Sequence, residues 1–303
     1  MQLDSTSIAI RERGLLDTCD LALHVVRRHI GPLILTFSAG AIPLMLLNHA
    51  LLGWMMDVEY RDMWFYTEET GAIFRFLWDM MLLVVIEAPL ASIFATKYLG
   101  QAVFLERPLL SEVFLDVLKM LPRVAWCQLL VRGILATWLL VLTLDRYGDF
   151  HIGVEILLLG GIAVYASLLR AVRPFNNEIV LLERNPLRSN EETVMTVGRR
   201  SWQLHGPSSA DLFGRWLGTA LFAVLLTAAV MGAFIFLSGV FLHDWKPGPI
   251  MISYGFPLSM WIVAGYLTVV RFLSYVDLRI RHEGWEVELR MRAEATRLQS
   301  TLT

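Results

Sequence analysis

Six apolar segments, each long enough to cross a lipid bilayer, dominate this sequence. They cover residues 31–53, 73–96, 124–144, 152–172, 216–242 and 250–275. A transmembrane helix needs about 20 apolar residues to span about 30 Å of hydrocarbon, and each segment is near or above that length. Hydrophobic residues make up 56% of the chain and charged residues only 18%, a balance that favours lipid over water as the solvent. The sequence therefore predicts an all-α, polytopic membrane protein with six transmembrane helices.

The Lys and Arg residues of the N-terminal segment, the connections and the tail indicate how the chain crosses the membrane. In chain order they number 4, 1, 4, 1, 7, 1 and 6, where Arg170 and Arg271, near the ends of their apolar segments, are counted with the fourth connection and the tail. Cytoplasmic loops are enriched in Lys and Arg, so the alternation predicts an even number of spans with both termini in the cytoplasm.

The predicted cytoplasmic segments have helical patterns of their own. Residues 1–30 contain an amphipathic helix that leads into the first span, and a second amphipathic pattern follows Pro108. Residues 189–192 have the spacing of a capping box, which predicts the start of a helix in the fourth connection. Residues 276–303 read as a charged helical tail. We expect the amphipathic helices to lie at the cytoplasmic interface.

No motif that carries enzymatic chemistry occurs in the sequence. The longest stretch outside the spans, residues 173–215, is too short for an appended soluble domain, so residues 1–303 form one membrane domain in this interpretation. The histidines and cysteines are scattered without metal-ligand or redox spacing. Phosphate-binding loops, dinucleotide-binding motifs and nucleophile elbows are absent. We therefore expect no enzyme and no catalytic, cofactor-binding or metal-ligating residue, and a net charge of −2 gives no reason to expect nucleic acid as a partner.

Three stretches of the chain resemble a broad bacterial group of membrane proteins. They are RERGLLDTCDLALHVVRRHIGPLI at 11–34, RPFNNEIVLLERNPL at 173–187 and FLSYVDLRIRHEGWEVELRMR at 272–292. The group is the membrane domain named after glycerophosphoryl diester phosphodiesterases, with its Yip-like six-span relatives. The resemblance implies this fold and topology and, with the basic loops, favours a bacterial cytoplasmic (inner) membrane. It implies no phosphodiesterase activity, because that chemistry belongs to a separate soluble barrel, and it supplies no catalytic residue.

Four charged residues inside the second and third predicted spans are the main candidates for a site. Arg75 and Asp79 are four residues apart on one helical face, which predicts a local ion pair. Glu87 is about ten residues, ~15 Å, from the inner end of its span, and Arg132 is about nine residues, ~13.5 Å, into the next span. Because an unpaired charge in mid-membrane is costly, we predict an intramembrane salt bridge between Glu87 and Arg132.

These buried charges allow a structural or a transport interpretation. As pairs, they would hold neighbouring spans together. If they are unpaired and in contact with water, they would line an ion or solute path or a cavity together with Asn48 and His49, near the outer end of the first span.

The leading functional hypothesis is a non-enzymatic scaffold or accessory subunit of a membrane protein assembly. The cytoplasmic helices would contact other membrane or cytoplasmic proteins, and lipids would surround the spans. Small residues at four-residue spacing in the fifth span favour packing inside the bundle or a homo-oligomer face: Ala228, Ala229, Gly232 and Ala233. The alternative is a transporter or channel for a small or lipidic solute that uses the polar residues of the first three spans. A lipid-acting intramembrane enzyme is a third reading, for which no nucleophile–base pair stands at a recognisable spacing.

Overall fold

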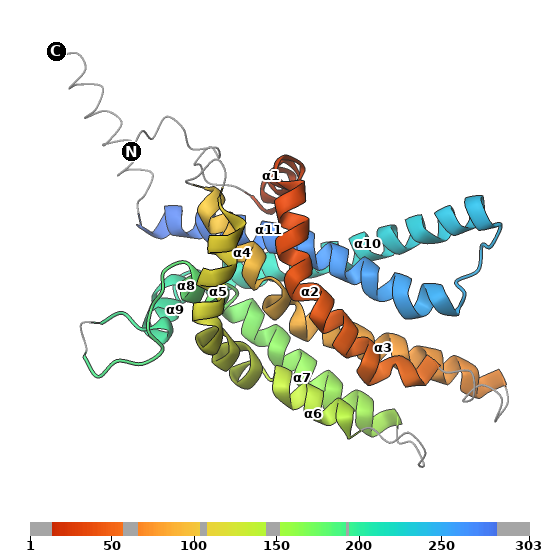
Figure 1. Ribbon diagram of the computed structural model, residues 1–303. Helices are drawn as coiled ribbons and strands as arrows, with labels where there is room; N and C mark the ends of the chain where they lie inside the picture. Colours follow the sequence, from red (N-terminus) through yellow and green to blue (C-terminus); the bar gives the residue numbers. More distant parts are fainter. Residues whose placement is uncertain (1–13, 57–65, 104–107, 144–151, 192–193, 284–303) are drawn as a thin grey trace.

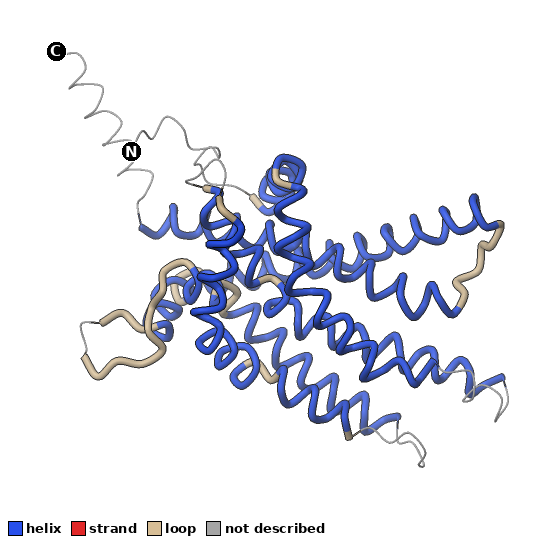
Figure 2. The backbone as a smooth tube through the Cα atoms, in the orientation of Figure 1, coloured by secondary structure: helices blue, strands red, loops and turns tan. Residues whose placement is uncertain are grey.

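The apolar segments fold as helices because lipid offers no partner for backbone N–H and C=O groups, which a helix satisfies internally. The computed structural model describes residues 14–56, 66–103, 108–143, 152–191 and 194–283, and this part of the chain contains helices and loops but no strand (Figure 2). Its elements are, in chain order, α1 (Leu15–Arg28), α2 (Ile30–Leu52), η2 (Gly53–Met56), α3 (Tyr66–Ala91), α4 (Ile93–Ala102), α5 (Leu110–Ala125), η4 (Trp126–Val131), α6 (Ile134–Leu142), α7 (Ile152–Val172), α8 (Asn176–Leu181), α9 (Val197–His205), α10 (Ser209–Leu242), η5 (Met251–Gly255) and α11 (Phe256–Glu283).

The described helices provide three to five candidate membrane spans. Three stretches are long and apolar enough alone: Ile30–Met56, Ser209–Leu242 and Met251–His282. Two bent helix pairs would bring the number to five if each forms one span: Ile73–Ala91 with Ile93–Ala102, and Leu110–Val131 with Ile134–Leu142. The fourth predicted span folds as α7, whose apolar stretch in the described chain is shorter, Ile156–Val172. The length and apolar character of these helices indicate an integral membrane protein. The number of six spans and the cytoplasmic position of both termini stay predictions.

The long helices form three pairs that spread from a common region (Figure 1). α2 lies beside α3, α6 beside α7, and α10 beside α11. The shorter helices α4, α5, α8 and α9 gather where the pairs converge (Figure 1). The break between α3 and α4, where several buried polar side chains meet, lies in this region of convergence (Figure 1).

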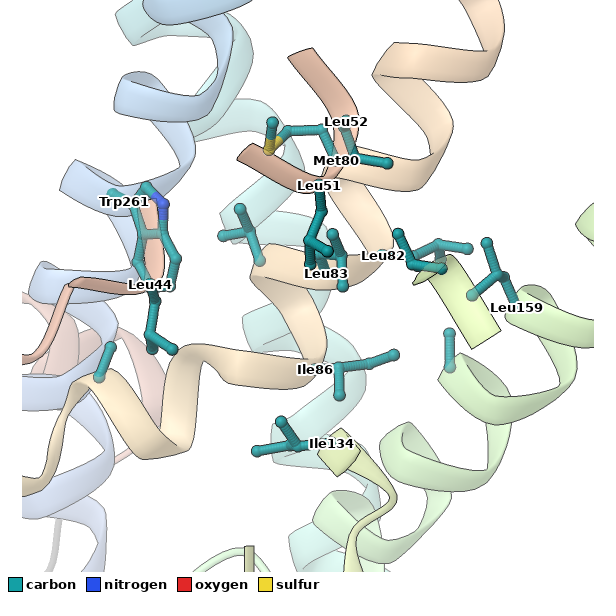
Figure 3. Packing of buried hydrophobic residues seen from close by; sticks show 14 of the residues in the cluster. Leu44, Leu51, Leu52, Met80, Leu82, Leu83, Ile86, Ile134, Leu159 and Trp261 are labelled. Carbon is teal, nitrogen blue, oxygen red and sulfur yellow. The ribbon is translucent and has the colours of Figure 1, made fainter. Parts of the chain in front are cut away.

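A hydrophobic core joins the pairs at their inner faces. Figure 3 shows side chains from α2, α3, α6, α7 and α11 in this core, among them Leu44, Leu83, Ile86, Ile134, Leu159 and Trp261. At Gly40 the backbone of α2 lies against the end of α3, where an added Cβ would stand 2.8 Å from the carbonyl carbon of Ala91. Only glycine permits this approach, which fixes the depth at which α2 crosses α3.

Two predicted spans are broken helices instead of continuous ones. The segment predicted at 73–96 ends as α3 at Ala91 and resumes as α4 at Ile93 with a bend of 40°. Pro89 accounts for this break, because proline lacks a backbone donor and its ring clashes with the preceding turn. The segment predicted at 124–144 passes from the π-helical η4 through Gly133, at φ 78°, into α6 with a bend of 60°.

Helices also form outside the predicted spans. α1 covers Leu15–Arg28 of the predicted entry helix, and α5 begins at Leu110, shortly after Pro108. α11 continues to Glu283, and the rest of the predicted tail, like residues 1–13, lies outside the described residues. Their placement at a membrane interface stays a prediction.

The helix predicted to begin at Ser189 is wrong at its start. Residues 188–191 are not helical, and α9 begins at Val197. Ser189 Oγ accepts a hydrogen bond from the backbone N–H of Glu191 at 3.1 Å, which closes a local turn in place of a helix cap. Thr196 caps α9 by accepting from the backbone N–H of Arg199.

α10 leaves most of its apolar surface outside the bundle. No residue of its most apolar stretch is buried, and along the whole helix only Leu212 and Gly239 are. Figure 1 shows the far part of α10 beside α11, away from the other two helix pairs. The small residues of the fifth predicted span all lie on the exposed face, so their packing inside the bundle is ruled out: Ala228, Ala229, Gly232 and Ala233.

Candidate functional site

The first part of the site is the carboxylate of Glu87, fully buried on α3 shortly before the helix break. Its Oε2 accepts a hydrogen bond from Asn48 Nδ2 of α2 at 2.7 Å, and its Oε1 accepts one from Trp138 Nε1 of α6 at 2.6 Å. One carboxylate therefore joins three helices. Both of its partners are neutral donors, so these bonds stabilise Glu87 without an opposite charge.

The predicted salt bridge between Glu87 and Arg132 is not formed. Arg132 donates from Nη2 to the carbonyl oxygen of Arg173 at 2.9 Å, at the end of α7. The prediction matched the two depths along straight helices, but the 60° bend after η4 carries the third predicted span away from that line. Arg132 consequently binds a backbone carbonyl at the end of α7 instead of a carboxylate.

Of the remaining predicted site residues, His49 follows Asn48 on α2, and Arg75 and Asp79 precede Glu87 on α3. His49 Nε2 lies 3.1 Å from the hydroxyl of Tyr254, and the guanidinium of Arg75 stands over the ring of Trp54 at 5.1 Å. Asp79 is buried on α3. The Arg75–Asp79 pair and a cavity lined by Asn48 and His49 stay predictions.

Side chains from distant helices bind the backbone at the break between α3 and α4. Asn177 of α8 donates from Nδ2 to the carbonyl oxygen of Pro89 at 2.6 Å, and Ser92 Oγ donates to the same oxygen at 2.8 Å. Gln128 of η4 donates in turn to Asn177 Oδ1. A broken helix leaves carbonyls without intrahelical partners, and these amides and hydroxyls satisfy them where water is excluded.

Three arginines surround this break. Arg170 of α7 donates from Nη2 to the carbonyl oxygen of Ile86 at 2.7 Å, and Arg132 binds the end of α7 as described. Arg271 of α11 pairs with Glu178 of α8, Nε to Oε1 at 2.8 Å, and also donates to Ser92 and Thr96. The three guanidinium groups repel one another electrostatically. Glu178 is the acid bonded to this group, so we call Glu87, Arg132, Arg170, Asn177, Glu178 and Arg271, with their partners, the polar centre.

Sequence reasoning missed four of the six residues that define the polar centre. Arg170 and Arg271 were counted among the basic residues of the fourth connection and the tail, and Asn177 and Glu178 were not singled out as site residues. A signal was present, since Asn177 and Glu178 directly precede the apolar run IVLL and Arg271 interrupts the apolar run TVVRFL. A charge inside such a run predicts burial with a partner.

A histidine lies buried beside the polar centre, on α9. His205 Nδ1 lies 2.7 Å from the carbonyl oxygen of Ser201, and its ring stacks on Phe175 at 5.6 Å. Burial lowers the pKa of His205 to about 4, against a smaller opposing effect of the bond to Ser201. His205 is therefore neutral near pH 7 and acts there as a packed, hydrogen-bonded ring.

Comparison with known proteins adds no assignment to this geometry. No known protein family, curated protein or solved structure matches the chain. Within the described ranges, no three or more His, Cys, Asp or Glu side chains are grouped so that they would hold a metal ion. The resemblance to the six-span bacterial group stays a prediction.

Proposed function

We propose that this chain is a non-enzymatic scaffold or accessory subunit of a membrane protein assembly, in which a partner helix packs against α10. The exposed face of α10 carries this proposal. Ala228 and Gly232 lie on it, and apart from the adjacent residues and the backbone of α10 itself, no atom of the described residues stands within 4 Å of a Cβ built on Gly232. Small residues let two helix backbones approach closely, whereas contact with lipid chains requires no such groove.

The bonding inside the bundle supports the same proposal. Asn48 and Trp138 hold Glu87 from two other helices, and Asn177 holds the break at Pro89. Such contacts fix helices relative to one another, which is what a subunit needs to present a constant surface to its partners.

Filling the small-residue face of α10 tests the proposal. The double variant Ala228→Leu/Gly232→Leu should lose the proteins that cross-link to and co-purify with the wild-type chain from native membranes. Val240→Leu, which adds bulk at another exposed position of α10, is the matched control and should keep them. A wild-type chain that runs as a monomer without cross-linked partners contradicts the proposal.

A transporter or channel is the second candidate, and the surroundings of Glu87 favour it. Among the described residues this buried carboxylate has no cationic partner, and it stands beside a helix break. Intramembrane acids and broken helices mark the ion and substrate sites of many transporters. Proton flux into dye-loaded proteoliposomes tests this reading: wild-type protein and Glu112→Gln should carry flux and Glu87→Gln should not. Equal flux from Glu87→Gln and Glu112→Gln counts against it.

A further inference from the structure

A cavity of about 280 Å³ lies between α1, α4 and α11, outside the polar centre. Its deep wall is apolar and consists of buried side chains that include Val25, Leu99, Ala102 and Phe272. Its mouth is formed by exposed or half-buried basic side chains, His24, Arg28 and His29. The cavity is thus amphipathic, with positive charge at the entrance and hydrocarbon inside.

The spacing of residues on α1 produces this arrangement. His24 and Arg28 are one helical turn apart, and Val25 lies between them on the side that faces α4 and α11. His29 is held at the start of α2 by the hydroxyl of Tyr98, 3.0 Å from its Nδ1. His24 Nδ1 lies 3.0 Å from the carbonyl oxygen of Asp20 and 4.0 Å from its carboxylate.

Arg28 is the group available to a ligand. It is exposed, and among the described residues it forms no hydrogen bond and no ion pair. A guanidinium offers five N–H donors in a planar fork that fits two oxygens of a phosphate. A guanidinium without a partner among the described residues, at the entrance of an apolar cavity, favours a ligand that has an anionic head and an apolar chain.

The position of the cavity identifies where such a ligand comes from. The apolar stretch Ile30–Met56, long enough to span a membrane, begins two residues after Arg28. The cavity therefore lies at the end of a candidate span, at the level where lipid headgroups meet hydrocarbon. Basic pockets between helices at this level are suited to anionic lipid headgroups. The volume of the cavity is below that of ordinary drug-sized sites, about 300–1,000 Å³. The cavity can therefore hold part of one acyl chain, while the rest of the lipid stays in the bilayer.

We propose that this cavity binds one anionic phospholipid, with an acyl chain against Val25, Leu99 and Phe272 and its phosphate at Arg28 and His24. The residues that line the site do not include any from α10, so the lipid proposal and the scaffold proposal are tested independently. It gives the chain a preference for anionic membrane surroundings beyond the general contact of its spans with lipid.

Lipid titration of the full-length protein in detergent, followed by native mass spectrometry, tests the site. Phosphatidylglycerol should bind at least fivefold more tightly than phosphatidylcholine, since each basic group near an anionic headgroup contributes about a factor of five. Arg28→Gln should remove about that factor. Arg27→Gln is the matched control, because this neighbouring arginine is also exposed but does not line the cavity.

A filling substitution tests the apolar part. Ala102→Phe should abolish the preferential binding of phosphatidylglycerol. Val103 also lines the cavity, so Val103→Phe serves as a second filling variant if Ala102→Phe lowers the unfolding temperature. Equal binding of the two lipids, equal effects of Arg28→Gln and Arg27→Gln, or unchanged binding in both filling variants would overturn the proposal. Displacement of the lipid by millimolar glycerol phosphate would also overturn it, because it would show a site for a free phosphate.

Discussion

Replacing Glu178 by Gln removes the acid that is bonded to Arg271 in the polar centre. Glu178 is fully buried, its Oε1 accepts from Arg271 at 2.8 Å, and its charge also interacts with Arg132. Removing one partner of a buried ion pair costs about 3–5 kcal/mol, because the remaining charge stays buried without compensation. The side chain of Arg271 is 21% exposed and keeps its bonds to Ser92 and Thr96, so we expect a loss near the lower end, about 3 kcal/mol.

Unfolding of the purified protein in mild detergent measures this loss. Gln retains the volume and an acceptor oxygen, so the change reports the missing charge. Glu112→Gln, at an exposed position of α5, should change stability by no more than about 0.5 kcal/mol. The double variant Glu178→Gln/Arg271→Gln should recover part of the loss, because it no longer buries an unpaired charge. Equal stabilities of Glu178→Gln and Glu112→Gln, or strict additivity in the double variant, would refute the reasoning.

Three further predictions concern packing, pH and the bonds of Glu87. Gly40→Ala should destabilise the protein by about 1–3 kcal/mol in the same assay, since its Cβ would stand 2.8 Å from the Ala91 carbonyl carbon, whereas Gly31→Ala, with no atom within 4 Å, should not. His205 has its pKa lowered by burial from 6.5 to about 4, and the unfolded chain binds the proton first. The free energy of unfolding should therefore be highest above pH 6.5 and fall by up to about 3 kcal/mol on acidification to pH 4. His205→Phe should reduce this dependence of stability on pH. Trp138→Phe leaves Glu87 Oε1 without its donor and should cost about 1–3 kcal/mol, unlike Trp126→Phe at an exposed position.

Apolar segment length and periodicity predict the helices well, because both properties are local. The segment after Pro108 forms α5, and the apolar run at 216–242 lies within α10. The predicted start at Ser189 failed because a local hydrogen bond to Glu191 competes with the helix, and Thr196 supplies the cap seven residues later. Helix existence was thus easier to predict than helix boundaries.

The polar centre was predictable only in part, because its partners are set by packing. That Glu87 would be buried with a partner follows from its apolar surroundings, but its partners turned out to be Asn48 and Trp138. Extrapolating straight helices to equal depth pointed to Arg132, and the bend at Gly133 invalidates that extrapolation. A glycine inside an apolar segment is not sufficient to predict a positive φ angle or a bend from the sequence.

Two of the contacts at the break between α3 and α4 come from parts of the chain that are synthesised much later. The carbonyl oxygen of Pro89 is bound by Asn177, 88 residues further on, and that of Ile86 by Arg170, 84 residues further on. At about 5–20 residues per second, a ribosome needs roughly 4–18 s to make the intervening chain. During that interval the nascent α3–α4 segment has none of these long-range bonds, and the carbonyl oxygen of Pro89 has only the local bond from Ser92 Oγ. The long-range bonds that hold this break can therefore form only after α7 and α8 have been synthesised.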